Sequence, residues 1–419
     1  MVPEGWLREP LCDVADVRTG IAKGKKDLKD PVSVPYLRVA NVQDGHLDLT
    51  VIKNIYVEPH QIERYRLKDG DVLMTEGGDF DKLGRGDVWK GQIDPCLHQN
   101  HVFCVRPNQK IILPYFLSSL SGSSYGKFYF LSCAKKSTNL ASINSTQLKE
   151  FPVLVPPISE QRKIISILST WDKAIETVEK LIENSKAQKK AQMQQLLTGK
   201  RRLPGFDGKW EKAYLEDITD ITMGSSPSSD FYNDMGDGLP LIQGNADIKD
   251  RKTVPRVYTS QITKTCSKGN ILLSVRAPVG AVAISEHDAC IGRGIASIAG
   301  KNNFPLSFIY QLLLAFESKW GQISQGSTFD AVNSKDIKKL KISIPLSRKE
   351  QQKIATVLTT ADKEIEALQQ KRDCLKQEKK ALMQQLLTGK RRVKVEAVSF
   401  SHTPSFPRTR ESRRLPDNE

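Results

Sequence analysis

The sequence predicts an α+β fold: two mixed α/β globular domains in a pseudo-twofold arrangement, separated by two long helices that form an antiparallel coiled coil. Three observations support this prediction. The decapeptide MQQLLTGKRR occurs twice, at Met193–Arg202 and Met383–Arg392. An apolar stripe in alternating steps of four and three residues leads into each copy. The rest of the chain carries short apolar runs between Gly, Pro and Asp turns.

The repeat extends well beyond the decapeptide. Residues 160–202 align without a gap with residues 350–392, and more than half of the pairs are identical. Upstream, WLREPLCDVADVRTG (6–20) pairs more weakly with WEKAYLEDITDITMG (210–224). The chain therefore contains two copies of one structural unit. We divide it into globular domains at 1–157 and 204–346, helical segments at 158–203 and 347–393, and a tail at 394–419 whose composition predicts disorder.

Both helical segments have predicted ends. Ser159 and Ser347 are expected to cap the two N-termini, Ser347 in a capping box with Glu350. Gly199 and Gly389 are expected to end the helices. The first helix would be roughly 57 Å long at 1.5 Å per residue. The coiled-coil core is expected to comprise Ile164, Leu168, Trp171, Ile175, Val178, Ile182, Leu196, Ile354, Leu358, Ala361, Ile365, Leu368, Leu375, Leu382 and Leu386.

Connectivity predicts the direction of the helices. The second globular domain begins where the first helix ends, and the second helix begins where that domain ends. Parallel helices would oblige this domain to bridge the whole length of the helix pair. Antiparallel helices place both connections at one end, so we expect the antiparallel arrangement.

Both globular domains are expected to contain short strands and one matching helical region. Strands are predicted at Asp71–Met74, His101–Val105, Asn270–Val275 and Ala281–Ile284. Helices are predicted at Leu113–Phe130 and Pro305–Trp320.

Composition narrows the class of protein. The net charge of +15 and pI of about 9.3 favour a polyanionic partner, most commonly nucleic acid, and most of the excess positive charge lies in the two helical segments. No apolar run approaches the length of a membrane span, and the N-terminus has no leader pattern. The seven cysteines never form CxxC. These features predict free thiols and a cytoplasmic location.

The sequence lacks recognisable catalytic motifs. It has no GxxxxGK[ST] phosphate loop, no Gly-rich cofactor loop after a strand, no Asp/Asn-Pro-Pro-aromatic motif and no nuclease signature of paired carboxylates with Lys. The segment CLHQNHVFC places Cys96, His98, His101 and Cys104 close together. The matching segment around Cys290 has no His, so we interpret this cluster as a strand and turn and expect no metal site.

Polar loop residues are the candidates for contacts with DNA. Arg can bond guanine bidentately, Asn or Gln can bond adenine, and Ser or Thr can contact phosphates. The candidates are Lys23, Lys25, Lys26, Lys29, Arg38, Asn41, Lys82, Arg85, Ser137, Thr138, Asn139, Gln243, Asn245, Arg276, Arg293, Ser327 and Thr328. Each one taken singly is more often a solvated surface residue than a DNA contact.

The helical segments resemble a known family. SEQRKI and KEQQKI at the helix starts, LLTGKRR at both ends and TGKRRLPGF at the junction are similar to the specificity subunit of type I restriction–modification enzymes, the HsdS family. The resemblance covers residues 1 to about 392 and excludes the tail. It implies that each globular domain is a target recognition domain for one half of a bipartite site on double-stranded DNA. It also implies that the helix pair sets the gap between the half-sites.

The same resemblance implies partners and no catalysis by this chain. Two methyltransferase subunits would dock on the helices, and restriction subunits would join them. S-adenosylmethionine, ATP and Mg²⁺ are expected on those partner subunits, and the complex would be a restriction endonuclease and adenine-N6 DNA methyltransferase. Recognition residues vary within the family, so none of the candidates above is carried over from it.

Two other hypotheses are compatible with the residues. A non-enzymatic scaffold with tandem coiled coils would use its charge to bind an acidic protein partner. An enzyme with an unfamiliar nuclease or methyltransferase site would be active without partners. Neighbouring methyltransferase and helicase-nuclease genes would favour the specificity subunit over both.

Overall fold

The computed structural model describes residues 2–23, 28–80, 83–138, 140–302, 304–320 and 331–395. Packing divides the chain into two units: unit 1 comprises Met1–Ile175 with Cys374–Glu419, and unit 2 comprises Glu176–Asp373. Two long helices, α6 (Ile158–Leu196) and α11 (Arg348–Leu386), begin in one unit and end in the other. Each unit therefore contains a globular domain, the N-terminal part of one long helix and the C-terminal part of the other.

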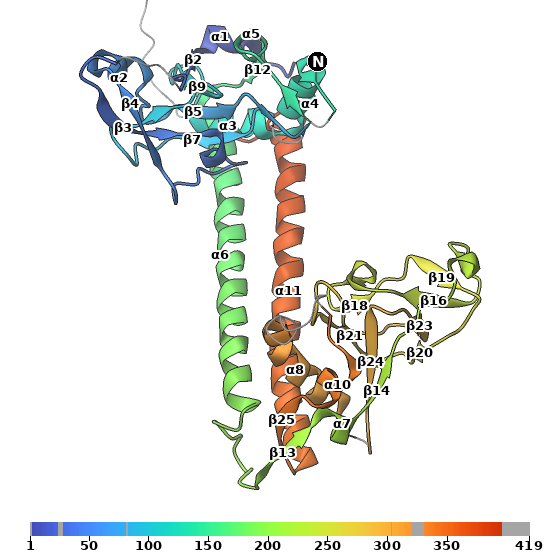
Figure 1. Cartoon of the computed structure of the whole chain (residues 1–419). Helices are drawn as coiled ribbons and strands as arrows, with labels where there is room; N and C mark the ends of the chain where they lie inside the picture. Colours follow the sequence, from blue (N-terminus) through green and yellow to red (C-terminus); the bar gives the residue numbers. More distant parts are fainter. Residues whose placement is uncertain are drawn as a thin grey trace, which may run out of the picture. The chain divides into compact units, whose positions relative to one another are not determined.

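The described residues of the globular part of unit 1 (Figure 1) form four small sheets, with strand orders β2-β9-β5-β7, β4-β3-β8, β10-β11-β6 and β1-β12. Its described elements are β1 (Leu7–Pro10), α1 (Leu11–Val14), β2 (Ala15–Thr19), β3 (Val32–Leu37), η1 (Val39–Asn41), β4 (Lys53–Val57), α2 (Pro59–Tyr65), β5 (Val72–Thr75), β6 (Gly77–Gly78), β7 (Gly86–Val88), β8 (Leu97–His98), β9 (Val102–Pro107), α3 (Pro114–Gly122), α4 (Ser124–Cys133), β10 (Lys135–Lys136), β11 (Ala141–Ser142), α5 (Ser145–Lys149) and β12 (Pro152–Val155).

The globular part of unit 2 contains sheets of orders β14-β24-β21-β22-β18-β17, β15-β19-β16-β23-β20 and β13-β25. Its described elements are β13 (Trp210–Tyr214), α7 (Leu215–Ile218), β14 (Thr219–Met223), η3 (Ser229–Phe231), β15 (Tyr232–Asn233), β16 (Leu239–Ile242), η4 (Asn245–Asp247), β17 (Ile248–Lys249), β18 (Lys252–Thr253), β19 (Val257–Thr259), β20 (Thr265–Cys266), β21 (Ile271–Ser274), β22 (Val282–Ile284), β23 (Ala289–Ile291), β24 (Ile295–Gly300), α8 (Leu306–Phe316), η5 (Glu317–Lys319), α10 (Ser334–Lys338) and β25 (Lys341–Pro345).

The two globular parts share one topology. The order β2-β9-β5-β7 in unit 1 corresponds to β14-β24-β21-β22 in unit 2, and β4-β3-β8 corresponds to β19-β16-β23. Each of these second sheets contains one parallel pair, β3 with β8 in unit 1 and β16 with β23 in unit 2, which sets Leu37 beside His98 and Ile242 beside Ile291. The weak upstream sequence match therefore reflects a duplicated fold.

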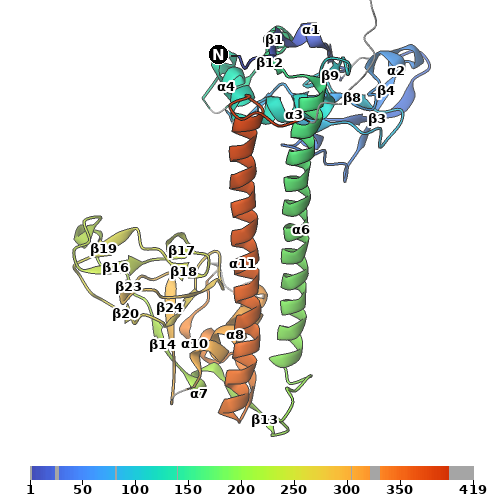
Figure 2. The same cartoon turned by 180° about the vertical axis from the view of Figure 1, so that it is seen from behind.

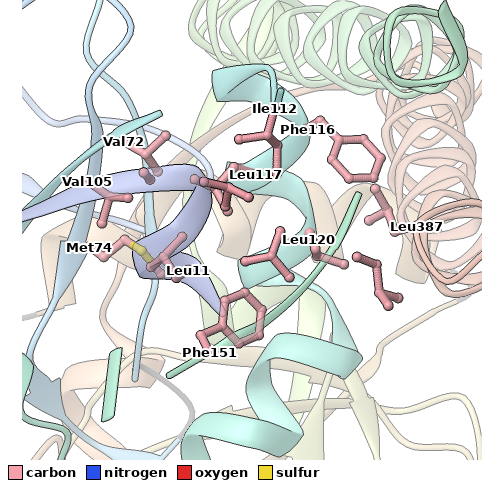
Figure 3. Close-up of a cluster of buried hydrophobic side chains, with 14 of the residues drawn as sticks. Leu11, Val72, Met74, Val105, Ile112, Phe116, Leu117, Leu120, Phe151 and Leu387 are labelled. Carbon is pink, nitrogen blue, oxygen red and sulfur yellow. The ribbon is translucent and has the colours of Figure 1, made fainter. Parts of the chain in front are cut away.

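The core of unit 1 joins its globular part to the long helices. Leu11, Met74, Phe116 and Phe151 are buried in one cluster that also contains Leu387, just after α11 (Figure 3). Ile164 and Leu168 of α6 belong to the same cluster. In unit 2 the corresponding cluster contains Leu196 of α6 and Leu358 of α11. Burial of this kind stabilises by about 25 cal/mol for each Å² of apolar surface removed from water.

Within each unit the two long helices run antiparallel. In unit 1 the N-terminal part of α6 lies beside the C-terminal part of α11 (Figures 1 and 2), and Asp172 accepts a hydrogen bond from Lys379. In unit 2 Lys189 donates to Asp362. Lys189 and Lys379 interrupt the apolar stripe and occupy equivalent places in the repeat, as do Asp172 and Asp362. The repeat therefore encodes the same ion pair twice and fixes the register of the helices.

The predicted helix ends are mostly confirmed. Ser347 precedes α11, and its Oγ accepts from the Glu350 backbone N–H at 3.4 Å, which is one of the two hydrogen bonds of a capping box. Gly199 and Gly389 adopt φ of +70° and +67°, which favours glycine. The prediction for Ser159 is wrong, because α6 begins at Ile158, and Pro157 accepts the first helical hydrogen bond from Gln161.

The predicted helices of the globular parts are shorter than expected. The segment predicted at 113–130 forms two helices, because the Ser123 side chain caps a new start by accepting from the Gly126 backbone N–H. The segment predicted at 305–320 is α-helical only to Phe316 and continues as the short helix η5. The four predicted strands correspond to β5, β9, β21 and β22.

Burial refines the predicted coiled-coil core. Ten of the predicted residues are buried: Ile164, Leu168, Ile175, Val178, Ile182, Leu196, Ile354, Leu358, Ile365 and Leu386. The other five, Trp171, Ala361, Leu368, Leu375 and Leu382, are only partly buried. The ends of the stripe pack into the globular cores, so the stripe also anchors the globular parts to the helices.

Among the described residues, no helix combines the length and the apolar character that crossing a membrane requires.

Candidate nucleic-acid interface

Four of the predicted DNA-contacting residues line one hollow in unit 2. Gln243, Asn245, Arg276 and Arg293 surround a cavity of about 240 Å³ together with Ser226 and neighbouring backbone. They come from loops that follow β16, β21 and β23, and Ser226 comes from the loop that follows β14. The folding of two sheets therefore gathers side chains that lie up to 67 residues apart in the sequence.

Backbone hydrogen bonds hold these loops together. The Gly292 N–H donates to the Ile242 carbonyl at 2.8 Å, and the Val275 N–H donates to the Gly294 carbonyl at 2.9 Å. The Arg293 N–H donates to the Ser226 hydroxyl at 3.1 Å. A Cβ at Gly294 would lie 2.3 Å from the Gln243 carbonyl oxygen, so this close approach requires glycine. These contacts tie the loops that form the hollow to one another.

The side chains of the hollow carry positive charge and hydrogen-bonding groups. Arg276 and Arg293 are exposed, and none of the described lining residues is acidic. The Gln243 Nε2 donates to the Tyr232 hydroxyl at 2.9 Å, which orients its amide. The Asn245 Oδ1 is buried and makes no hydrogen bond within the described residues. Guanidinium and amide groups in a fixed frame are the groups that bind guanine and adenine edges.

Unit 1 builds the same loops with different side chains. The Gln99 N–H donates to the Leu37 carbonyl at 2.8 Å, and the Glu76 N–H donates to the His101 carbonyl at 3.1 Å. These bonds match the Gly292 and Val275 bonds of unit 2. Glu76, Asn100 and His101 thus stand where unit 2 carries Val275, Arg293 and Gly294. Our sequence candidates missed Glu76 and Asn100, although the CLHQNHVFC segment was matched to the segment around Cys290.

Asn41 holds a loop and does not face a ligand. It is only 3 % exposed. Its Oδ1 accepts from the Arg38 N–H at 3.0 Å, and its Nδ2 donates to the carbonyls of Asp48 and Val51. Asp247 reproduces the accepting contact in unit 2, where its Oδ2 accepts from the Gln243 N–H at 2.8 Å. The Asn41 amide is therefore occupied by backbone groups, whereas Arg38 stands at the position of Gln243.

The remaining described candidates are distributed over unit 1. Lys23 lies 5.5 Å above the centre of the Tyr36 ring, and the backbone N–H of Lys29 donates to Glu58. The Arg85 side chain is half-buried, and Ser137 bonds the Leu140 carbonyl next to the exposed Thr138. These residues stay predictions. Six candidates lie outside the described residues: Lys25, Lys26, Lys82, Asn139, Ser327 and Thr328.

The last Arg of each decapeptide bonds a carboxylate and lies beside a Trp ring, and we call this pair of contacts the clamp. In unit 2 the Arg202 Nε and Nη2 donate to the two Glu350 carboxylate oxygens at 2.7 and 2.8 Å, and the guanidinium lies 5.8 Å from the Trp210 ring centre. Hydrogen bonding to Glu350 raises the pKa of Arg202. In unit 1 Arg392 makes the same contacts with Glu160 and Trp6.

The last Arg of each KRR run therefore ties a helix end to the start of a globular domain. Lys200 and Arg201, and their equivalents Lys390 and Arg391, are exposed.

The cysteines and histidines of the CLHQNHVFC segment have separate roles. Burial raises the pKa of the Cys96 thiol to about 12 and lowers the pKa of His98 to about 4. His98 Nδ1 bonds the Val102 carbonyl at 2.7 Å, whereas His101 points outward to Glu76. In the described part of the chain, no group of three or more His, Cys, Asp or Glu side chains is arranged to hold a metal ion.

The chain, with its duplicated loops and clamps, is similar to known proteins. The family model of the type I restriction modification DNA specificity domain matches residues 3–184 and 207–377. The chain belongs to this family. The two matches correspond to the two copies of the repeat, so each copy is one specificity domain.

Two curated relatives match nearly the whole length of the chain. It is 34% identical over 407 residues to the putative type I restriction enzyme MjaX specificity subunit of Methanocaldococcus jannaschii, which covers 94% of this chain and 95% of the relative. It is 25% identical over 423 residues to the MjaVIII specificity subunit of the same organism, with 94% of both chains covered.

Solved structures share its fold. A chain from a study of complex assembly and conformational transition of the type I R-M system has a TM-score of 0.65 at 25% identity, covering 92% of this specificity protein and 98% of that chain. The type I restriction–modification S subunit from M. genitalium has a TM-score of 0.56 at 14% identity, covering 92% and 99%. The second likeness shows the fold alone.

Proposed function

We propose that this chain is the DNA sequence-specificity subunit of a type I restriction–modification enzyme, in which each globular domain reads one half of a bipartite site on double-stranded DNA. The observation that carries the proposal is the duplicated loop cluster, which presents one set of polar side chains in unit 1 and another in unit 2. The two domains share the backbone of the loops but carry different side chains there, so they can recognise two half-sites of different sequence.

The long helices have the dimensions of a spacer. Each contains 39 residues, and at 1.5 Å per residue each is roughly 58 Å long. Half-sites separated by one to one and a half turns of duplex lie about 34–54 Å apart. We propose that the helix pair sets the gap between the half-sites.

Partner subunits supply the chemistry in this proposal. Methyltransferase subunits, two per chain, dock on the helices and bring S-adenosylmethionine, and restriction subunits bring ATP and Mg²⁺. The assembly would act in the cytoplasm, where its DNA lies. The full-length similarity to specificity subunits favours this function over a protein-binding scaffold.

The direct test is coexpression of the full chain with a cognate methyltransferase subunit, followed by methylome sequencing of the host DNA. We expect adenine methylation at a single bipartite motif with a fixed gap, and no methylation when either subunit is expressed alone. Nuclease or methyltransferase activity of the purified chain by itself, or methylation at a continuous motif, would contradict the proposal.

A further inference from the structure

We infer that the cluster of Glu76, His101 and Asn100 in unit 1 reads a base amino group in the major groove, whereas Arg276 and Arg293 in unit 2 read guanine. This assignment rests on the proposed function and adds the chemistry by which each domain selects its half-site. It gives the two domains opposite hydrogen-bonding character at the same place in the fold.

The unit 1 cluster is a directed chain of hydrogen bonds. His101 Nδ1 lies 2.6 Å from Glu76 Oε2, and His101 Nε2 lies 3.4 Å from Asn100 Nδ2. Both contacts are satisfied when Nδ1 carries the proton and donates to Glu76, so that Nε2 accepts from Asn100. The chain of donors therefore ends at the Glu76 carboxylate and holds it in one orientation.

This cluster is accessible and its backbone is fixed. The Glu76 and His101 side chains are 31% and 55% exposed. The Glu76 carbonyl accepts from the Ile143 N–H at 2.9 Å, in addition to the bond between the Glu76 N–H and the His101 carbonyl. The carboxylate thus lies at the end of β5, on the loop that corresponds to Val275 and Arg276 in unit 2.

The charge of Glu76 identifies its ligand. A carboxylate beside DNA is repelled by phosphates, so it favours binding only where it accepts a hydrogen bond from a base. The major-groove donors are the amino groups of cytosine and adenine, and Glu characteristically accepts from cytosine. Asn100, at the position of Arg293, adds an amide that can bond adenine. Guanine offers only acceptors in this groove and is disfavoured by Glu76.

Unit 2 has the opposite character. Its hollow presents two exposed guanidinium groups and no described acidic side chain. Arg donates two hydrogen bonds to the O6 and N7 acceptors of guanine. The half-site read by unit 2 should therefore contain guanine at a position where the half-site read by unit 1 presents an amino group.

The test uses the complete chain coexpressed with its methyltransferase subunit and methylome sequencing. The variants are Glu76→Gln and Asn100→Ala in unit 1, Arg293→Ala in unit 2, and Glu150→Gln as a matched control on the exposed end of α5. Gln keeps the shape of Glu but also donates. We expect Glu76→Gln to reduce the preference at one base pair of one half-site roughly 5- to 150-fold, with tolerance of adenine.

The other variants separate the possible outcomes. Arg293→Ala should relax a guanine position in the other half-site, Asn100→Ala should affect the same half-site as Glu76→Gln, and the Glu150 control should change neither. If Glu76→Gln and Asn100→Ala leave both half-sites intact while Arg293→Ala relaxes one, the unit 1 assignment is wrong and the proposed function stands. If no variant changes the motif and exchange of residues 1–150 also leaves it unchanged, both fall.

Discussion

The length of the helix pair should determine the gap in the recognised site. The perturbation is an insertion of four residues after Lys180 in α6 and after Gln370 in α11, which are equivalent positions of the repeat. Four residues lengthen a helix by about 6 Å and rotate it by about 40° beyond one full turn. The apolar face is thus nearly retained on both sides of the insertion.

The expected change follows from the geometry of DNA. An extension of about 6 Å corresponds to about two base pairs at ~3.4 Å each. Methylome sequencing should therefore show a gap about two base pairs longer, with both half-site sequences unchanged. The ion pairs Lys189 with Asp362 and Lys379 with Asp172 lie on either side of the insertions and should persist. An insertion in α6 alone breaks the matched length and should abolish methylation.

An unchanged gap in the double-insertion variant would refute this reasoning. A change of half-site sequence would refute it equally, because the insertions leave both globular parts intact. Circular dichroism and copurification with the methyltransferase subunit verify that the variant is folded and assembled.

Three further predictions concern stability. Leu168 and Leu358 are buried at equivalent positions of the repeat, and Ala at either position should lower the free energy of unfolding by about 2–5 kcal/mol in denaturant titrations. As a control, Leu181→Ala, at a side chain that is 46% exposed, should change this free energy by less than about 0.5 kcal/mol. Equal effects of the buried and exposed substitutions would contradict the assigned cores. Burial lowers the pKa of His98 to about 4 from 6.5. Below pH 6.5 the unfolded chain therefore binds a proton that the folded chain does not, and the free energy of unfolding should fall by about 3 kcal/mol as the pH drops to 4. His98→Gln should remove this part of the pH dependence, and a variant with an unaltered pH profile would contradict this role of His98. Arg202→Ala leaves the buried Glu350 carboxylate without its partner and should lower the melting temperature. Alanine at the exposed Lys200 and Arg201 should leave the melting temperature unchanged. A larger loss from the Lys200 and Arg201 substitutions than from Arg202→Ala would contradict the role assigned to Arg202.

The duplicated sequence predicted the helices well because repetition and apolar periodicity are local signals. The antiparallel direction followed from connectivity. The ion pairs of Lys189 and Lys379 with Asp362 and Asp172 were seen only in the structure. The start of α6 was missed because Ser159 resembles a cap, whereas the residue equivalent to Ser347 is Pro157. Proline has no side-chain hydroxyl or carboxylate that would mark it in the sequence as the cap of a helix.

The candidate site was only partly predictable because its residues meet through sheet pairing. Gln243, Arg276 and Arg293 were chosen by residue type, and the structure brings them together. Asn41 was chosen by the same criterion, but its amide bonds the backbone, and sequence cannot distinguish the two uses. Glu76 and Asn100 both contact His101 because β5 pairs with β9. A carboxylate is not an obvious ligand for DNA.

Each globular domain should select its half-site independently of the other. Residues 1–150 are replaced by the corresponding segment of a family member with a different target, and the chimaera is coexpressed with the same methyltransferase subunit for methylome sequencing. One half-site should become that of the donor, while the other half-site and the gap remain those of this chain. Replacement of both half-sites, or of neither, would contradict the central claim.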